Sequence, residues 1–235
     1  MKVKLSALAL GLTLAYGATS ALAAEATIDQ SGGFSTAEIT QFFNGEEIEA
    51  TITTSGWNNN HEITQTLSER VWADIDASGS FNDARISQSM LNYGGAEVKQ
   101  DASGSSVNVN QGADFYFLGA GTSQWAFVNQ SSGFGHDANI LQRGHKVEAR
   151  VNQSGVGNDA DIVQIGTGAA FNEARVTQSG AHQQASVSQI GSGLVATVTQ
   201  SGAGHKAQVV MTGDNHTATV RQSGWGNTAR IFQGN

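Results

Sequence analysis

Apolar and polar residues alternate along this chain in a five-residue phrase, Ala-x-(Ile/Val)-x-Gln, which occurs eighteen times between residues 26 and 233. The third position is Ile or Val in every copy. The exceptions elsewhere are His61 and Val107 in the first position and Thr54, Ala77 and Met211 in the fifth. Positions one, three and five of an extended strand share one face, and positions two and four share the other. Each copy therefore predicts a β-strand whose Ala, Ile/Val and Gln side chains point inward.

The spacing of the copies predicts how the strands are stacked. Taken in pairs, the copies are 11 residues apart within eight pairs and 12 apart in the ninth, whereas the steps between pairs vary from 11 to 19 residues. The fixed connection commonly reads Ser-Gly-x-x-Asn, as in Ser154–Asn158, and Gly and Asn suit tight reversals. Self-similarity at a short period is typical of stacked repeats. The sequence thus predicts an all-β fold, a cross-β solenoid of about nine two-stranded layers.

Amide side chains that recur at one position in successive layers are the main candidate for a structural site. A stacked amide donates to one neighbouring layer and accepts from the other. The alternative is that each Gln only closes its strand at the solvent edge. The candidate ladder residues are Gln30, Gln41, Gln88, Gln142, Gln153, Asn158, Gln164, Gln178, Gln189, Gln200, Gln222, Asn227 and Gln233.

The chain divides into four segments. Residues 1–23 have two lysines followed by an uncharged run and small residues, the pattern of a secretory signal with cleavage at Ala23 or Ala24. A membrane anchor is the alternative interpretation, although glycines interrupt the run. Less regular repeats then occupy residues 24–111, an insertion occupies 112–125, and regular repeats occupy 126–235. Both ends of the repeat region are expected to lack a cap and to be the growing surfaces of an assembly.

The composition of the chain makes some classes of partner and site improbable. Without Lys2 and Lys4 the chain has 12 − 2 = 10 basic and 20 acidic residues, a net charge of −10, which disfavours nucleic acid as a partner. The chain has no cysteine, so disulfides do not stabilise the exported protein, and no proline, which suits strands that pair on both edges. We expect no catalytic residues, no metal site and no cofactor. His136 and His205 occupy the Asn position of the fixed connection and are expected to substitute for it.

The paired phrase resembles the repeat of the curlin family, the subunits of curli amyloid fibres. Ala149–Gln164 and Ala218–Gln233 show it in full, as Ala-x-(Ile/Val)-x-Gln-x-Gly-x-x-Asn-x-Ala-x-(Ile/Val)-x-Gln. The resemblance covers the whole repeat region and is closest in its second half. Two departures are the number of units, nine, and the lack of a Gly-rich segment before the first repeat. That lack is more similar to the nucleator subunit than to the major subunit.

The resemblance implies a function and its partners. It implies export through the periplasm and a dedicated outer-membrane secretion pore with accessory factors. It further implies assembly with itself and with other curlin subunits into an extracellular, pilus-like fibre. Such fibres mediate adhesion to host or abiotic surfaces and form biofilm matrix.

Other functions are known for β-solenoids. The alternative to a fibre subunit is a monomeric extracellular β-solenoid that binds ice or polysaccharide. An ice-binding face needs outward Thr-x-Thr in register, and Thr51-x-Thr53 and Thr197-x-Thr199 are interrupted by Asp74-x-Asp76 and Arg150-x-Asn152. A hydrolase needs paired carboxylates on a groove, whereas the acidic residues here are scattered. The Gly-Gly-x-Gly-x-Asp pattern of calcium-binding solenoids does not occur.

Overall fold

The computed structural model describes residues 24–42, 45–113 and 123–235, so the proposed signal segment and most of the proposed insertion lie outside the described residues. The described chain forms eighteen strands in two nine-stranded parallel sheets. No described helix is long and apolar enough to cross a membrane. The prediction of an all-β solenoid with nine two-stranded layers is confirmed.

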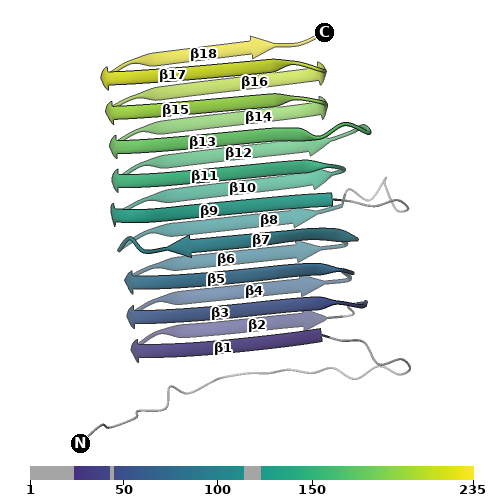
Figure 1. Cartoon of the computed structure of the whole chain (residues 1–235), viewed down its shortest axis with the longest axis vertical. Coiled ribbons are helices and arrows are strands. Elements are labelled where there is room, and N and C mark those ends of the chain that lie inside the picture. Colours follow the sequence, from purple (N-terminus) through teal and green to yellow (C-terminus); the bar gives the residue numbers. More distant parts are fainter. Residues whose placement is uncertain (1–23, 43–44, 114–122) are drawn as a thin grey trace, which may run out of the picture.

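Consecutive strands alternate between the two sheets, which lie face to face as flat stacks with the N-terminal layer at one end and the C-terminal layer at the other (Figure 1). The odd sheet contains β1 (Ala24–Gly33), β3 (Ile48–Trp57), β5 (Val71–Ser80), β7 (Tyr93–Gln100), β9 (Ser123–Phe134), β11 (Val147–Val156), β13 (Asn172–Ala181), β15 (Val195–Ala203) and β17 (Thr217–Trp225). The even sheet contains β2 (Thr36–Phe42), β4 (Asn60–Thr66), β6 (Asp83–Ser89), β8 (Ser106–Gly112), β10 (Asp137–Gly144), β12 (Asp159–Gly166), β14 (Gln184–Ser192), β16 (Lys206–Asp214) and β18 (Thr228–Gln233).

Each odd strand and the even strand that follows it form one layer, and the layers are numbered from β1 and β2 (layer one) to β17 and β18 (layer nine). Equivalent positions of the phrase lie directly above one another in successive layers. Ala149 pairs with Ala174, Val151 with Val176 and Gln153 with Gln178, and the same register continues through both sheets. The single 12-residue step is absorbed by a bulge in β9: Gln130 pairs with Gln153, but Ser132 pairs with Ser154, so Ser131 is the extra residue. The inserted residue therefore leaves the stacking of the following layers unchanged.

The core is a thin sandwich of the inward Ala and Ile/Val side chains. These residues are almost fully buried in the inner layers, for example Ile52, Ile75, Val98 and Val176. Most outward positions carry Thr, Ser, Asn and charged residues, with ion pairs such as Arg85–Glu62 at 2.8 Å, and the later strands of the even sheet also carry apolar ones. Inward and outward positions thus alternate along each strand, as expected for the period of two in a β-strand.

Candidate functional site

Two ladders of glutamine side chains run through the interior, one along each sheet. In the even sheet, Nε2 of each Gln donates to Oε1 of the next at 2.7–2.9 Å, in the order Gln41, Gln65, Gln88, Gln111, Gln142, Gln164, Gln189. In the odd sheet, five such bonds of 2.8–3.1 Å connect Gln100, Gln130, Gln153, Gln178, Gln200 and Gln222. All these residues except Gln41 are buried, so they lie inside and not at a solvent edge.

Each ladder glutamine also connects the two sheets. Nε2 of Gln164 donates to the backbone oxygen of Glu148 at 3.0 Å, and Nε2 of Gln178 donates to that of Asp159 at 2.8 Å. The acceptor belongs to the strand of the opposite sheet that precedes the glutamine in the chain. Because both amide hydrogens and the amide oxygen have partners, burial of this polar group costs little.

The ladders have a direction and a limited extent. In every Gln–Gln bond the donor lies in the layer nearer the N-terminus and the acceptor in the layer nearer the C-terminus. The odd ladder is interrupted at Thr54 and Ala77, which leaves Nε2 of Gln30 and Oε1 of Gln100 buried without a partner. The even ladder stops at Met211, next to which Oε1 of Gln233 has no partner. The candidates Gln30 and Gln233 therefore stand apart from the internal ladders.

Four ladder members are absent from the candidate set drawn from the sequence: Gln65, Gln100, Gln111 and Gln130. The phrase itself contains the signal, because each of the four occupies its fifth position. Gln124 is also buried, outside the phrase, and its side chain bonds to the backbone of Gly112 and Gly144 at 2.8–3.1 Å. It thus connects Gly112 of β8 with Gly144 of β10.

A third row of buried side chains lies in the fixed connections, and it includes the candidate Asn158. The backbone N–H of Asn82 donates to Oδ1 of Asn59 at 3.0 Å, and that of Gln183 donates to Oδ1 of Asn158 at 3.2 Å. His136 and His205 occupy the same position. Nδ1 of each accepts a backbone N–H from the next layer, and Nε2 lies 2.9 Å from a serine carbonyl four residues earlier. The side chain of Asn227 bonds within its own connection, from Nδ2 to the carbonyl of Ser223 at 2.7 Å, and no described layer follows it.

His61 is a buried polar residue in a position that is otherwise apolar. It replaces Ala in the first position of β4, its side chain is buried, and neither ring nitrogen has a hydrogen-bond partner. Burial lowers the pKa of His61 from 6.5 to about 4, although the nearby carboxylate of Asp83 acts in the opposite direction. The ring is therefore neutral in the folded protein at neutral pH, and two polar atoms are desolvated without compensation.

This burial predicts a pH dependence. Between pH 6.5 and 4 the unfolded chain binds a proton at His61 that the folded chain does not, so stability is lost as pH falls through this window, by about 3 kcal/mol in total. We expect His61→Ala to remove this loss. The measurement is the free energy of unfolding in urea for the wild type and the variant at pH 8, 6, 5 and 4. The difference in unfolding free energy between the two proteins at pH 8 reports packing and the desolvation of the neutral ring, and a difference that stays constant down to pH 4 would contradict the assignment.

No candidate metal site is present among the described residues. No group of three or more His, Asp or Glu side chains in the described ranges is placed to hold a metal ion. Clustered carboxylates do occur on the outer face of the odd sheet, where burial and then the negative charges of Glu97, Asp76 and Glu49 raise the pKa of Asp74. The interior of the molecule is thus built for hydrogen bonding between layers.

Comparison with known proteins identifies the repeat in part of the chain. The family model of the curlin associated repeat matches residues 172–202 and 195–224, which span β13 to β17. A search of curated proteins found no match, and a search of solved structures found none. The matched repeats stack in register with the rest of the solenoid, and the resemblance inferred from the phrase is confirmed. Residues 172–224 therefore contain curlin associated repeats.

Proposed function

We propose that this protein is the secreted subunit of a curli-like amyloid fibre, in which copies stack end to end. The observation that carries the proposal is the state of the terminal layers. Within the described residues, β1 and β2 have a strand neighbour on one side only, and so do β17 and β18. Ile28 in the first layer is 38% exposed, whereas its equivalent Ile52 in the second layer is fully buried. Open strand edges of this kind are templates for another chain.

The two ends are complementary in register and in hydrogen bonding. Stacking the ninth layer on the first layer of another copy sets Ala218, Val220 and Gln222 against Ala26, Ile28 and Gln30. It likewise sets Ala229–Gln233 against Ala37–Gln41. The direction of the ladders places amide donors at the C-terminal end and amide acceptors at the N-terminal end. Gln222 would therefore donate to Gln30, and Gln233 to Gln41, which continues both ladders across the junction.

The remaining parts of the proposal rest on the resemblance of the repeats to those of curlin subunits. Residues 1–23 would be removed at Ala23 or Ala24, and the chain would pass through the periplasm and an outer-membrane secretion pore. Residues 24–111, 112–125 and 126–235 would act as less regular repeats, insertion and regular repeats of one fibre subunit. The fibre, formed with itself or with other curlin subunits, would serve adhesion and biofilm matrix without catalysis, metal or cofactor.

The end-to-end arrangement predicts a specific effect of truncation. We expect the intact chain to form fibres with a reflection near 4.8 Å, because each layer is one strand spacing. Removing residues 218–235 exposes a layer whose even strand carries Met211, which cannot donate to Gln41 of the next copy. We expect the lag phase of assembly, followed by dye fluorescence, to lengthen several-fold.

The control restores the amide. Met211→Gln in the truncated chain supplies the missing donor and should recover much of the lost rate. A truncated chain that assembles as fast as the intact one would contradict growth at this end. An intact chain that stays soluble and dye-negative would contradict the fibre itself.

The alternative function, a monomeric ice- or polysaccharide-binding solenoid, has no comparable support. Outward Thr51 and Thr197 belong to one column of the odd sheet, but this column also contains Asp74, Phe127 and Arg150. Charged and aromatic residues thus interrupt the regular hydroxyl array that an ice-binding face requires.

A further inference from the structure

The outer face of the even sheet changes character in its last five layers. Outward residues of β10, β12, β14, β16 and β18 include an apolar patch formed by Leu141, Val163, Ile165, Ile190, Val210 and Phe232. Ile190 is 42% exposed and Phe232 is 65% exposed. In the first four layers, the column of Leu141 holds only polar residues: Thr40, Thr64, Ser87 and Asn110. Among the outward residues of β2, β4, β6 and β8, Phe42 in the first layer is the single large apolar one, so the continuous patch lies in the last five layers, where no described segment covers it.

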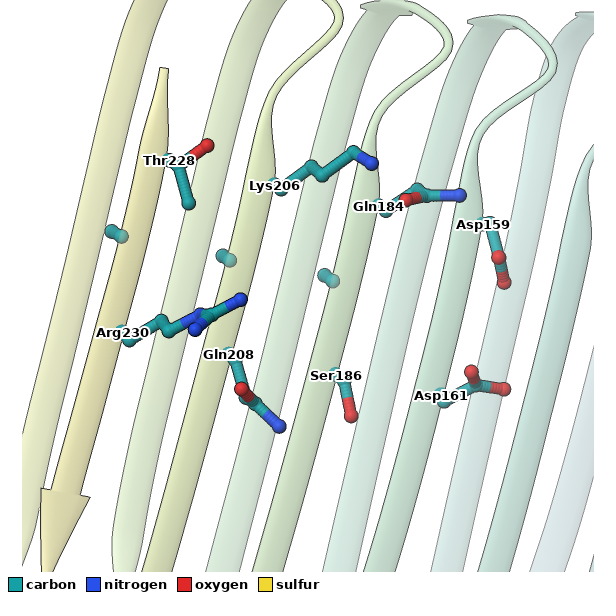
Figure 2. A pocket seen from close by; sticks show the side chains of 11 residues that line it. Asp159, Asp161, Gln184, Ser186, Lys206, Gln208, Thr228 and Arg230 are labelled. Atoms are coloured by element: carbon teal, nitrogen blue, oxygen red, sulfur yellow. The ribbon is translucent and has the colours of Figure 1, made fainter. Parts of the chain in front are cut away.

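Charges flank the patch with opposite signs at its two ends. Asp137, Asp159 and Asp161 lie in layers five and six, and Lys206 and Arg230 lie in layers eight and nine. Neither Lys206 nor Arg230 forms an ion pair in the described part of the chain. A shallow depression of about 270 Å³ lies between the charged groups. Figure 2 shows Asp159 and Asp161 on one side of it and Lys206 and Arg230 on the other, with Gln184 and Ser186 between them.

The carboxylates lack a cationic partner of their own. Burial and the neighbouring charge of Asp161 raise the pKa of both Asp137 and Asp159. Asn139 donates to Asp161 at 3.1 Å. Arg143, the cation among the outward residues of β10 and β12, donates instead to the backbone oxygens of Asn110 and Gln142. The acidic end would thus be stabilised by a cation supplied from outside.

The pattern is self-complementary about the strand β14. Let two copies meet through this face, related by a two-fold axis that lies between them and runs parallel to β14. Layer five of one copy then faces layer nine of the other, layer six faces layer eight, and layer seven faces layer seven. Asp159 then faces Lys206, Val163 faces Val210, and Leu141 faces Phe232. Ile190 lies near the axis and meets its own counterpart. A two-fold interface requires this kind of matching, in which one surface contains both halves of each pair.

We propose that this face binds a second copy of the chain through that two-fold axis. Five layers about 4.8 Å apart and strands of seven residues give about 500 Å² per copy, or about 1,000 Å² in total, near the lower limit of specific interfaces. Flat sheets pack face to face about 10 Å apart, which suits medium-sized apolar side chains. The interface goes beyond end-to-end stacking, because it joins solenoids side by side.

The position of the axis gives the pair a staggered arrangement. Since the axis passes through layer seven of nine, each copy overhangs the C-terminal end of its partner by four layers. In an end-to-end stack, those four layers lie beside the first four layers of the next copy. Each copy therefore bridges a junction in the opposite stack, and lateral pairing stabilises the end-to-end contact.

The first test places a charge on the axis. Ile190→Lys sets two lysines against each other, whereas Thr66→Lys puts the same outward substitution on the same column of the same sheet in layer two. For soluble chain, sedimentation should show a dimer in the wild type and in Thr66→Lys, because layer two lies outside the overlap of an isolated pair, and a monomer in Ile190→Lys. For fibres we expect two chains per nine layers in the wild type and a two-fold lower mass per length in Ile190→Lys.

The second test checks the register. Asp159→Lys and Lys206→Asp each oppose like charges twice in the dimer and should raise its dissociation constant about tenfold or more. The double variant should restore it. A wild type with one chain per nine layers that is also monomeric in solution overturns the proposal, and so does a double variant that stays weak. Because sedimentation needs no fibre, failure of end-to-end assembly would be seen separately, as the absence of the 4.8 Å reflection.

Discussion

Replacing Gly180 with alanine should destabilise the solenoid by at least about 4 kcal/mol, a loss reached only when packing is severely disturbed. Gly180 has a φ of +123°, and a β-carbon added there would overlap the carbonyl oxygen of Gly202 in the next layer. The obstacle is backbone, which no side-chain rotation relieves. Because the layers are held at one strand spacing, the substitution must open the stack between layers seven and eight.

Gly135 provides the matched control. It also has a positive φ, +70°, but a β-carbon there meets no atom within 4 Å. Gly135→Ala should therefore cost only the backbone strain, about 1–2 kcal/mol. The comparison is made by urea unfolding of the soluble chain and by the rate of fibre formation. Equal losses for the two variants would show that the close stacking of the glycine column does not limit stability.

Replacing Gln153 with leucine should cost about 3–5 kcal/mol, because several buried groups lose partners at about 1–3 kcal/mol each. Gln153 accepts from Nε2 of Gln130 at 2.9 Å and donates to Oε1 of Gln178 at 3.0 Å. It also bonds to the backbone oxygens of Asp137 and Asn158 at 2.8 and 3.1 Å. Leucine is close in size but satisfies none of these groups.

The neighbouring residue tests the same change on the other face. Asn152 points outward from the same strand and is exposed, so Asn152→Leu adds a similar side chain without breaking a ladder. We expect its stability to stay within about 0.5 kcal/mol of the wild type, as for most surface substitutions. If the two variants lose stability equally, the interior amides do not hold the layers together.

The fold could be predicted from the sequence because local and global signals coincide in one phrase. The invariant Ile/Val, as at Ile52 and Val176, set the strand period. The constant 11-residue step set the pairing of strands into layers. Parallel stacking of identical positions, such as Gln153 on Gln178, then follows from the repeat itself. Even the one 12-residue step caused only a local bulge at Ser131.

The hydrogen-bonding roles of the interior side chains could be predicted from the sequence only in part. Asn59, Ser105, His136 and Gln183 differ in type, but all lie in the same buried row, where Asn59, Ser105 and His136 accept backbone N–H groups. A pattern of residue identity does not reveal that shared acceptor role. The orientation of each amide is equally hidden, because a glutamine is compatible with either direction of the ladder. Full burial of His61 in an alanine position depends on the neighbouring layers, so only the structure could show it.

The common direction of the glutamine ladders gives the molecule an electrical polarity. Eleven side-chain amides donate toward the same end, and their dipoles add, whereas the strand dipoles of a sheet largely cancel. Head-to-tail stacking preserves the sign, so a single filament should orient in an electric field. Two solenoids related by an axis along β14 run in opposite directions, and their dipoles cancel. Electric birefringence would therefore be strong for single filaments and weak for paired ones.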